Sequence, residues 1–180
     1  RRRYDHHQES MVSTFPGFPV PLASCGLVYL HYGKEIIVNL SKKLNLSFDE
    51  QYMDFIYNYI YGKFIQEIDA KDNGFSECAE NAKPAYAIGT DISSRIGRMN
   101  PHWRIENPNF DEEFKKAVEY IGKEFEFFFA YALKFSIRQY QVVKEAFDHR
   151  LEADPNGQFF ILSSSVPIMD YLPLLEGDEK

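Results

Sequence analysis

The chain has 180 residues, of which 44% are hydrophobic, 16% aromatic and 26% charged, so it is long enough for one domain or for one domain and the start of another. This composition excludes disorder along the whole length, because the aromatic residues alone can bury a large apolar area. The 20 basic and 27 acidic side chains give a formal net charge of −7. That charge excludes a surface built for non-specific duplex binding and confines any nucleic-acid role to a local site. No run of about 18 apolar residues is present, so no membrane span is expected.

The two cysteines and the first residues bear on the compartment. Cys25 and Cys78 lie far apart and match no metal-binding spacing, so the chain can form at most one disulfide bond. We expect no disulfide and a reducing, intracellular compartment. The chain begins with Arg1 rather than methionine, and no apolar or serine-rich targeting stretch follows. We therefore expect a fragment whose targeting segment is not observable.

Two helices are predicted in the first half of the chain. Residues 13–21 contain three prolines and a glycine, which predict an extended loop. Apolar residues at helical spacing then predict a helix over 22–44, with a weak point at Gly33. The same spacing predicts a second helix over about 48–70.

Capping residues and turns mark the ends of the predicted helices. Ser47 and Glu50 resemble a capping box that opens the second helix. The turn residues 72–74 end it. Further along, Thr90 or Asp91 is expected to cap a short helix.

One long helix and one short strand are predicted in the second half of the chain. From Asp111 the apolar spacing stays helical for about 40 residues, which corresponds to about 60 Å at the helical rise. The turn residues 154–157 stop this pattern, and the apolar run 158–162 predicts a strand. We therefore expect a predominantly α-helical chain with a long connecting helix and a short strand near its end.

Asp5, His6 and His7 form the strongest chemical motif in the sequence. Neutral imidazole is the commonest transition-metal ligand, and a neighbouring carboxylate can orient the ring and set its tautomer. Two consecutive histidines point in different directions, so one can bind a metal while the other hydrogen-bonds a substrate oxygen. The alternative is a solvated or vector-derived basic terminus without function.

A pair of carboxylates lies at the predicted end of the second helix. Asp69 and Asp72 are three residues apart and therefore share a helix face. Hard carboxylate oxygens beside imidazole suit Mn²⁺ or Mg²⁺ better than a thiolate site would. The alternative role for either acid is capping and turn formation.

Two arginines, a tryptophan and a histidine are weaker candidates. Arg95 and Arg98 are three residues apart and can fork onto the phosphates of a substrate, although pairing with local acids is the commoner outcome. Trp103 can stack on a base, although burial is its commoner role. His31 is expected to be a core or capped histidine rather than a ligand.

Four blocks of sequence, in the same order, resemble one protein family. The blocks are Arg3–Gln8, Leu22–Gly33, Glu67–Gly74 and Ile92–Trp103. They are similar to the MYG1 exonuclease family (UPF0160), within the DHH phosphoesterase superfamily. The resemblance runs from residue 3 to about residue 162. It is expected to decay afterwards, because residues 166–169 replace a Cys-Pro-Trp-Lys-like stretch.

This resemblance implies an α/β parent fold and a two-metal phosphoesterase centre with Mn²⁺ or Mg²⁺. It implies hydrolysis of RNA phosphodiester bonds from the 3′ end, in nuclei and mitochondria. Within the catalytic site, His6 would ligate a metal, His7 would bind a substrate phosphate and Asp5 would support both. Asp72 or Asp69 would complete one metal site, and the sequence does not choose between them. Two such ions activate a water molecule and neutralise the leaving oxygen.

The resemblance also implies a division into domains. Residues 1–110 would form the carboxyl-terminal part of a DHH-type phosphoesterase domain, residues 111–153 a long connecting helix, and residues 154–180 the start of a second domain. A His-Asn-Gly-like block and a further Asp motif should precede residue 1. We therefore expect this chain alone to be weakly active or inactive.

Two other functions stay open. A small-molecule phosphohydrolase of the same superfamily, acting on pyrophosphate or a short nucleotide, suits the acidic net charge. A non-catalytic helical interaction module would have no metal affinity and would self-associate through the long aromatic helix. Substrate length separates the first alternative from an RNA exonuclease, and metal binding separates the second.

Overall fold

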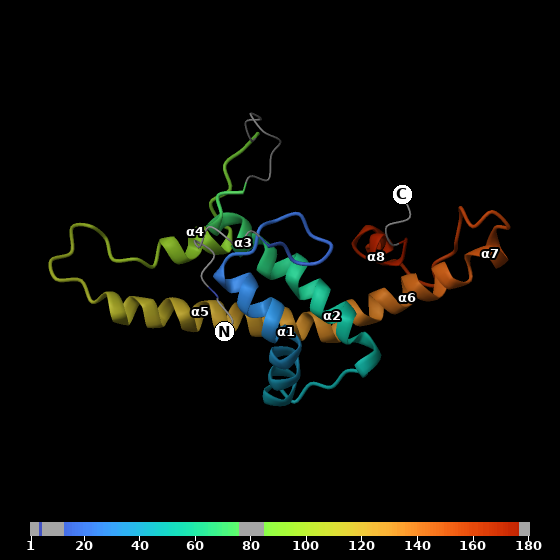
Figure 1. Cartoon of the computed structure of the whole chain (residues 1–180), viewed down its shortest axis with the longest axis horizontal. Coiled ribbons are helices and arrows are strands. Elements are labelled where there is room, and N and C mark those ends of the chain that lie inside the picture. The colour runs from blue at the N-terminus through green and yellow to red at the C-terminus, as the bar shows by residue number, and fades with distance from the viewer. Residues whose placement is uncertain (1–3, 5–12, 76–84, 177–180) are drawn as a thin grey trace. The chain divides into compact units, whose positions relative to one another are not determined.

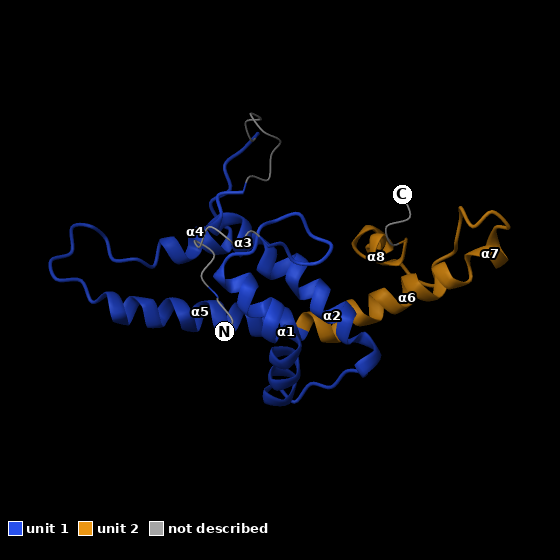
Figure 2. Cartoon of the chain, viewed as in Figure 1, with its two compact units in different colours: residues 1–130 blue, residues 131–180 orange. Residues whose placement is uncertain are grey.

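The described part of the chain is built from helices. The computed structural model describes residue 4, residues 13–75 and residues 85–176 (Figure 1). Within these ranges the only β pairing is an isolated antiparallel bridge between Thr14 and Pro21, so the expected helical content is confirmed. The chain divides into two compact units, residues 1–130 and residues 131–180 (Figure 2).

Helix α1 (Ser24–Lys43) follows the proline-rich loop and runs through Gly33 without interruption. A Cβ atom at Gly33 would lie 2.5 Å from Cε2 of Tyr57, so the missing side chain lets helix α2 (Met53–Ile60) approach α1 closely. The weak point expected at Gly33 therefore does not interrupt the predicted helix. Close packing at this position offsets the helix propensity of about 1 kcal/mol that glycine lacks relative to alanine.

The second helical run contains a 3₁₀ turn and a π-helix in addition to α-helix. Its elements are η1 (Glu50–Tyr52, 3₁₀), α2, η2 (Tyr61–Ile65, π) and α3 (Gln66–Asp72). Asp49 caps the start, because its Oδ1 accepts from Gln51 N at 3.0 Å. The expected capping box of Ser47 and Glu50 is therefore wrong, since a carboxylate closer to the helix provides the cap. The run ends at Asp72, and the φ of 64° at Gly74 fits the predicted turn that follows.

The core of the first unit lies between α1 and the 53–72 helical run. Phe15, in the loop before α1, stacks on Tyr61 with ring centroids 3.8 Å apart and an interplanar angle of 7°. Both side chains are fully buried. Apolar side chains of the two helical segments are buried as well, namely Leu27, Ile37, Ile56 and Ile60. Each such burial contributes roughly 1.5–3 kcal/mol, so the core fixes the position of α3 beside the start of α1.

Two further helices follow in the first unit, α4 (Ile92–Gly97) and α5 (Phe110–Tyr131). Asp91 caps α4 by accepting from Ser94 N at 3.1 Å, so one of the two expected caps is confirmed. On α5, the Phe125 ring meets Phe64 edge-on with centroids 5.2 Å apart. This contact joins α5 to the π-helix η2.

The second unit is helical as well. Its elements are η3 (Ala132–Ser136, π), α6 (Ile137–Asp148), α7 (Arg150–Ala153), η4 (Ile168–Asp170, 3₁₀) and α8 (Leu172–Glu176). Tyr171 is buried within it and donates from its hydroxyl to Gln139 Oε1 at 2.6 Å. The expected long helical segment is confirmed as a succession of α-, π- and α-helix from residue 110 to residue 148.

The predicted strand at residues 158–162 does not form. Phe160 meets the ring of Phe147 edge-on at 6.2 Å, while Phe159 and Ile161 are exposed. A strand needs a neighbouring strand to pair its backbone groups, and no such neighbour exists among the described residues. Of the described helices, none is long and apolar enough to cross a membrane.

Candidate functional site

Asp69 is a fully buried carboxylate at the junction of α3 and α1. Its Oδ1 accepts hydrogen bonds from Gly26 N at 2.9 Å and Ala23 N at 3.2 Å. Its Oδ2 accepts from the hydroxyl of Tyr61 at 3.1 Å. Ala23 precedes the first residue of α1 and has no side-chain oxygen to act as a cap. A carboxylate that is 46 residues away in sequence therefore caps α1 in place of a local residue.

Gly26 makes this long-range cap sterically feasible. A Cβ atom at this position would lie 1.9 Å from Asp69 Oδ2 and 2.6 Å from Asp69 Cγ. Any larger residue would therefore displace the carboxylate from the start of α1. Gly26 and Tyr61 are site residues that the sequence patterns did not predict. A glycine in the first turn of a strong helical pattern is the one sequence signal that points to such a close approach.

Asp69, Tyr61 and Cys25, the three titratable groups around this junction, each have a raised pKa. Burial raises the pKa of Asp69, and its hydrogen bonds from Gly26, Tyr61 and Ala23 partly offset this rise. Burial and the charge of Asp69 raise the pKa of Tyr61. Although Cys25 retains exposed surface and is a free thiol, desolvation and the charges of Asp69 and Asp72 raise its pKa to about 11. Cys25 is therefore a protonated thiol at neutral pH and a poor nucleophile.

The two predicted metal-ligating carboxylates have different environments. Asp69 is buried and accepts three hydrogen bonds, whereas Asp72, at the last residue of α3, is exposed. Both charges act on Cys25, so both acids lie near the start of α1. Asp5, His6 and His7 lie outside the described residues.

The described residues alone do not form a metal centre. They contain no group of three or more histidine, cysteine, aspartate or glutamate side chains that could hold a metal ion. The Asp69 oxygens have three of their acceptor positions filled, and the Cys25 thiol is not ionised at neutral pH. Asp72 is therefore the carboxylate in this region whose exposure is compatible with ligation.

The two arginines expected to bind phosphate have partners within the first unit. Arg95 donates to the Tyr120 hydroxyl at 2.8 Å and to Glu124 Oε1 at 2.9 Å. These hydrogen bonds, chiefly the one that Arg95 donates to Tyr120, raise the pKa of Arg95. Arg98 donates to the carbonyl oxygen of Gly89 at 2.7 Å. Arg95 therefore pairs with a local acid, which is the alternative that its spacing also predicted.

Trp103 and His31 do not have the environments expected from the sequence. Trp103 is 81% exposed rather than buried. Its ring stacks with the His102 ring, with centroids 5.6 Å apart, and the Arg104 guanidinium lies 4.7 Å from its centroid. His31 is exposed on α1 and meets the ring of Tyr4 edge-on at 5.8 Å. The burial expected for Trp103 is therefore wrong, and His31 is not a core histidine.

The chain is similar to known proteins over almost its whole length. The chain is 35% identical to the MYG1 exonuclease of Mus musculus over 98% of its own length and 47% of that protein. It is 34% identical to the MYG1 exonuclease of Homo sapiens, over 98% of this chain and 48% of that protein. The MYG1 protein of Saccharomyces cerevisiae is 29% identical, over 98% of this chain and 54% of that protein. No solved structure matches.

The mouse and human relatives are named as exonucleases, and a second comparison shows the family of this chain. The sequence profile of the uncharacterised protein family UPF0160, the MYG1 family, matches residues 1–180, and the chain belongs to this family. The resemblance carried by the four sequence blocks is therefore confirmed. Its expected decay after residue 162 is wrong, because the match extends to the last residue. The chain spans about half the length of the curated relatives it matches.

Proposed function

We propose that this chain contributes one part of a metal-dependent phosphodiesterase centre that removes nucleotides from the 3′ end of RNA. The observation that carries the proposal is the pairing of a structural and an accessible carboxylate, Asp69 and Asp72, at the end of α3 in a member of the MYG1 family. The names of the mouse and human relatives as exonucleases support the reaction class. The proposal also places the protein in the nucleus and the mitochondrion.

Within this proposal the two aspartates have separate roles. Asp69 fixes the start of α1 against α3, because it holds Ala23 N, Gly26 N and the Tyr61 hydroxyl at once. Asp72 lies one helical turn further on and carries the exposed carboxylate. We therefore assign ligation to Asp72 and positioning to Asp69.

The remaining roles fall on Asp5, His6 and His7. His6 would hold the metal with Asp72, and His7 would donate a hydrogen bond to a substrate phosphate. Asp5 would orient a histidine ring and set its tautomer. A Mn²⁺ or Mg²⁺ pair, when bound, supplies an activated water and neutralises charge on the leaving oxygen. The RNA would contact the protein only locally, since the net charge is −7.

Titration of Mn²⁺ into the 180-residue chain by calorimetry tests this assignment. We expect saturable binding that weakens at least about tenfold in Asp72→Asn, because a charged ligand becomes a neutral amide. Asp69→Asn is the matched variant, with the same chemical change three residues away, and should retain most of the binding. Equal binding by the wild-type chain and Asp72→Asn would refute the ligand assignment.

Hydrolysis of a 3′-labelled oligoribonucleotide with Mn²⁺ tests the reaction itself. The labelled nucleotide should be released from the 3′ end by a form of the protein that has the complete centre. Replacement of both His6 and His7 by alanine should abolish this release. Undiminished release in that double variant would exclude the proposed chemistry.

A small-molecule phosphohydrolase of the same superfamily is the second candidate, and the acidic charge of the chain favours it. A net charge of −7 repels a long polyanion more than a short one. Pyrophosphate, a dinucleotide and a 20-mer RNA should therefore be compared at equal concentration. Faster turnover of the two short substrates would support this second function over RNA degradation.

A further inference from the structure

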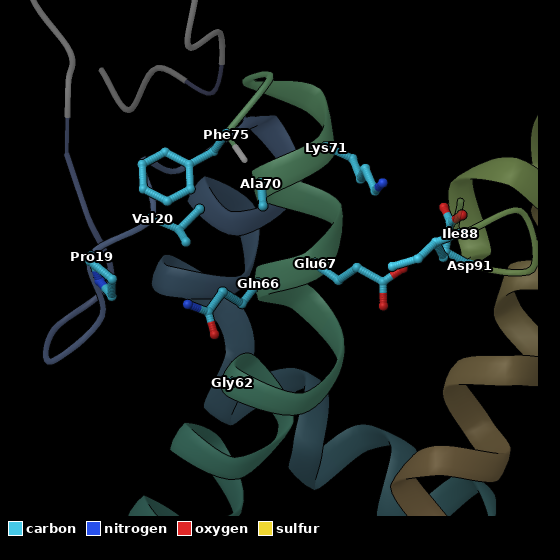
Figure 3. A pocket seen from close by; sticks show the side chains of 10 residues that line it. All are labelled: Pro19, Val20, Gly62, Gln66, Glu67, Ala70, Lys71, Phe75, Ile88 and Asp91. Atoms are coloured by element: carbon cyan, nitrogen blue, oxygen red, sulfur yellow. The ribbon is translucent and has the colours of Figure 1, made fainter. Parts of the chain in front are cut away.

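A cavity of about 630 Å³ lies along α3, on residues other than the buried Asp69 (Figure 3). Its volume is in the range of small-molecule sites. Glu67 and Lys71 extend from α3 on one side, toward Ile88 and Asp91. The apolar side chains of Val20 and Phe75 line the opposite side, and the small Ala70 lies between the two sides.

In the part of the chain that the structure describes, Glu67 and Lys71 do not form an ion pair with each other, although their spacing on α3 favours one. Glu67 precedes Lys71 by four residues on a helix, which is the favourable order for an ion pair. Glu119 and Lys123 have the same order on α5 and pair at 2.6 Å. Among the described residues, Glu67 and Lys71 form no such bond with each other. The cavity therefore presents one carboxylate and one ammonium group side by side.

Asp91 is a second carboxylate at this cavity, and its oxygens accept hydrogen bonds from Ser94. Hydrogen bonds from the Ser94 side chain and backbone, with a smaller contribution from the charge of Lys71, lower the pKa of Asp91. Its two oxygens are thus engaged in capping α4. Glu67 remains the carboxylate that faces the cavity without a partner in the described part of the chain.

We propose that this cavity binds a free α-amino acid with a large apolar side chain. The ammonium group of the ligand pairs with Glu67, its carboxylate pairs with Lys71, and its side chain crosses Ala70 to contact Phe75 and Val20. A zwitterion is the ligand class that matches one open charge of each sign. A nucleotide fits less well, because its phosphate would face Glu67 and Asp91 as well as Lys71.

Phe75 and Ile88 give the apolar part of the site its surface. They are 46% and 44% exposed, so a ligand side chain can remove apolar area of both from water. Ala70 lies at the base of the cavity between them, and its small methyl group leaves free a volume that a longer side chain would fill. A ligand with both charges but a small side chain should therefore bind less tightly.

Three matched probes test the proposal on the whole 180-residue chain. Their binding is monitored through amide chemical shifts in solution NMR, in the absence of metal. L-Phenylalanine carries both charges, 2-phenylethylamine lacks the carboxylate and 3-phenylpropionate lacks the ammonium group. We expect saturable shifts in pocket residues with phenylalanine, at about millimolar affinity, and about tenfold weaker binding of each single-charge probe. Because no metal or RNA is present, this outcome is independent of the proposed nuclease.

Variants of Glu67 and Lys71 sharpen the test. Glu67→Gln should remove the advantage of phenylalanine over phenylpropionate, and Lys71→Met should remove its advantage over phenylethylamine. Glu119→Gln removes the same charge from another exposed helix face and should leave binding unchanged. Ala70→Leu keeps both charges and fills the base of the cavity, so it should abolish binding of all three probes.

Several results would overturn the proposal. Equal binding of phenylalanine and phenylethylamine would show that the site reads only a cation. Binding of adenosine monophosphate that is tighter than that of phenylalanine would reassign the site to phosphate ligands. Absence of saturable shifts with all the probes, while the spectrum shows a folded chain, would show that the cavity is not a binding site for these ligands.

Discussion

The two faces of α3 use polar side chains in opposite ways. On the face toward α1, Asp69 is fully buried and accepts from three donors. On the cavity face, Glu67 and Lys71 are exposed and leave their favourable pairing unmade. A buried polar group must be satisfied within the protein, whereas an exposed one can remain available to a ligand. One helix therefore carries a structural face and a binding face, and this distinction can be tested residue by residue.

The largest effect is expected from Gly26→Ala. Its new Cβ atom would lie 1.9 Å from Asp69 Oδ2, in a place with no room to relax without loss of the cap. Overpacking together with loss of two backbone hydrogen bonds should lower the free energy of unfolding by about 3 kcal/mol. Urea denaturation measures this change. Gly122→Ala is the control, because nothing lies within 4 Å of its Cβ position on α5, and it should stabilise the chain slightly.

A smaller loss is expected from Asp69→Ala, which removes the carboxylate and leaves Gly26 N and Ala23 N without their acceptor. We expect a decrease of about 2 kcal/mol in the free energy of unfolding. Asp72→Ala, an exposed change at the end of the same helix, should alter it by less than about 0.5 kcal/mol. Similar losses in both variants would contradict the separation into structural and accessible carboxylates.

The helices that form this junction could be predicted from the sequence, but the contact between them could not. Apolar spacing predicted the helices that contain Gly26 and Asp69, because that spacing reflects local geometry. The cap itself joins residues 43 positions apart, and local patterns carry no information about such a contact. Asp69 and Asp72 therefore looked equivalent in the sequence, and burial alone separates them.

Errors elsewhere have the same origin. Asp91 was correctly included among the expected caps of α4, since capping is a local hydrogen bond. The strand expected at residues 158–162 and the burial expected for Trp103 both depend on partners that are distant in sequence. Local propensity therefore predicted helices and caps, but it did not predict which apolar residues find a partner.

Tyr61→Phe should have a still smaller effect on stability. It removes the hydroxyl that donates to Asp69 Oδ2 and keeps the ring that stacks on Phe15. The free energy of unfolding should fall by about 1 kcal/mol, measured by urea denaturation. Combination with Asp69→Asn completes a double-mutant cycle. An interaction energy near zero in this cycle would show that the hydrogen bond contributes no stability.

The smallest effect is expected in the pH dependence, because opposing causes act on the same carboxyl group. Burial raises the pKa of Asp69 above 3.8, while hydrogen bonds from Gly26, Tyr61 and Ala23 lower it. Just above pH 3.8 the folded chain therefore binds more protons than the unfolded chain. The contribution of Asp69 to the free energy of unfolding is then lost as the pH rises through its folded-state pKa. Asp69→Asn does not titrate at this position. The difference in unfolding free energy between the wild type and Asp69→Asn should therefore decrease from about pH 4 to about pH 7. An increase over the same interval would mean that the hydrogen bonds outweigh burial and that the buried face of α3 stabilises the ionised carboxylate.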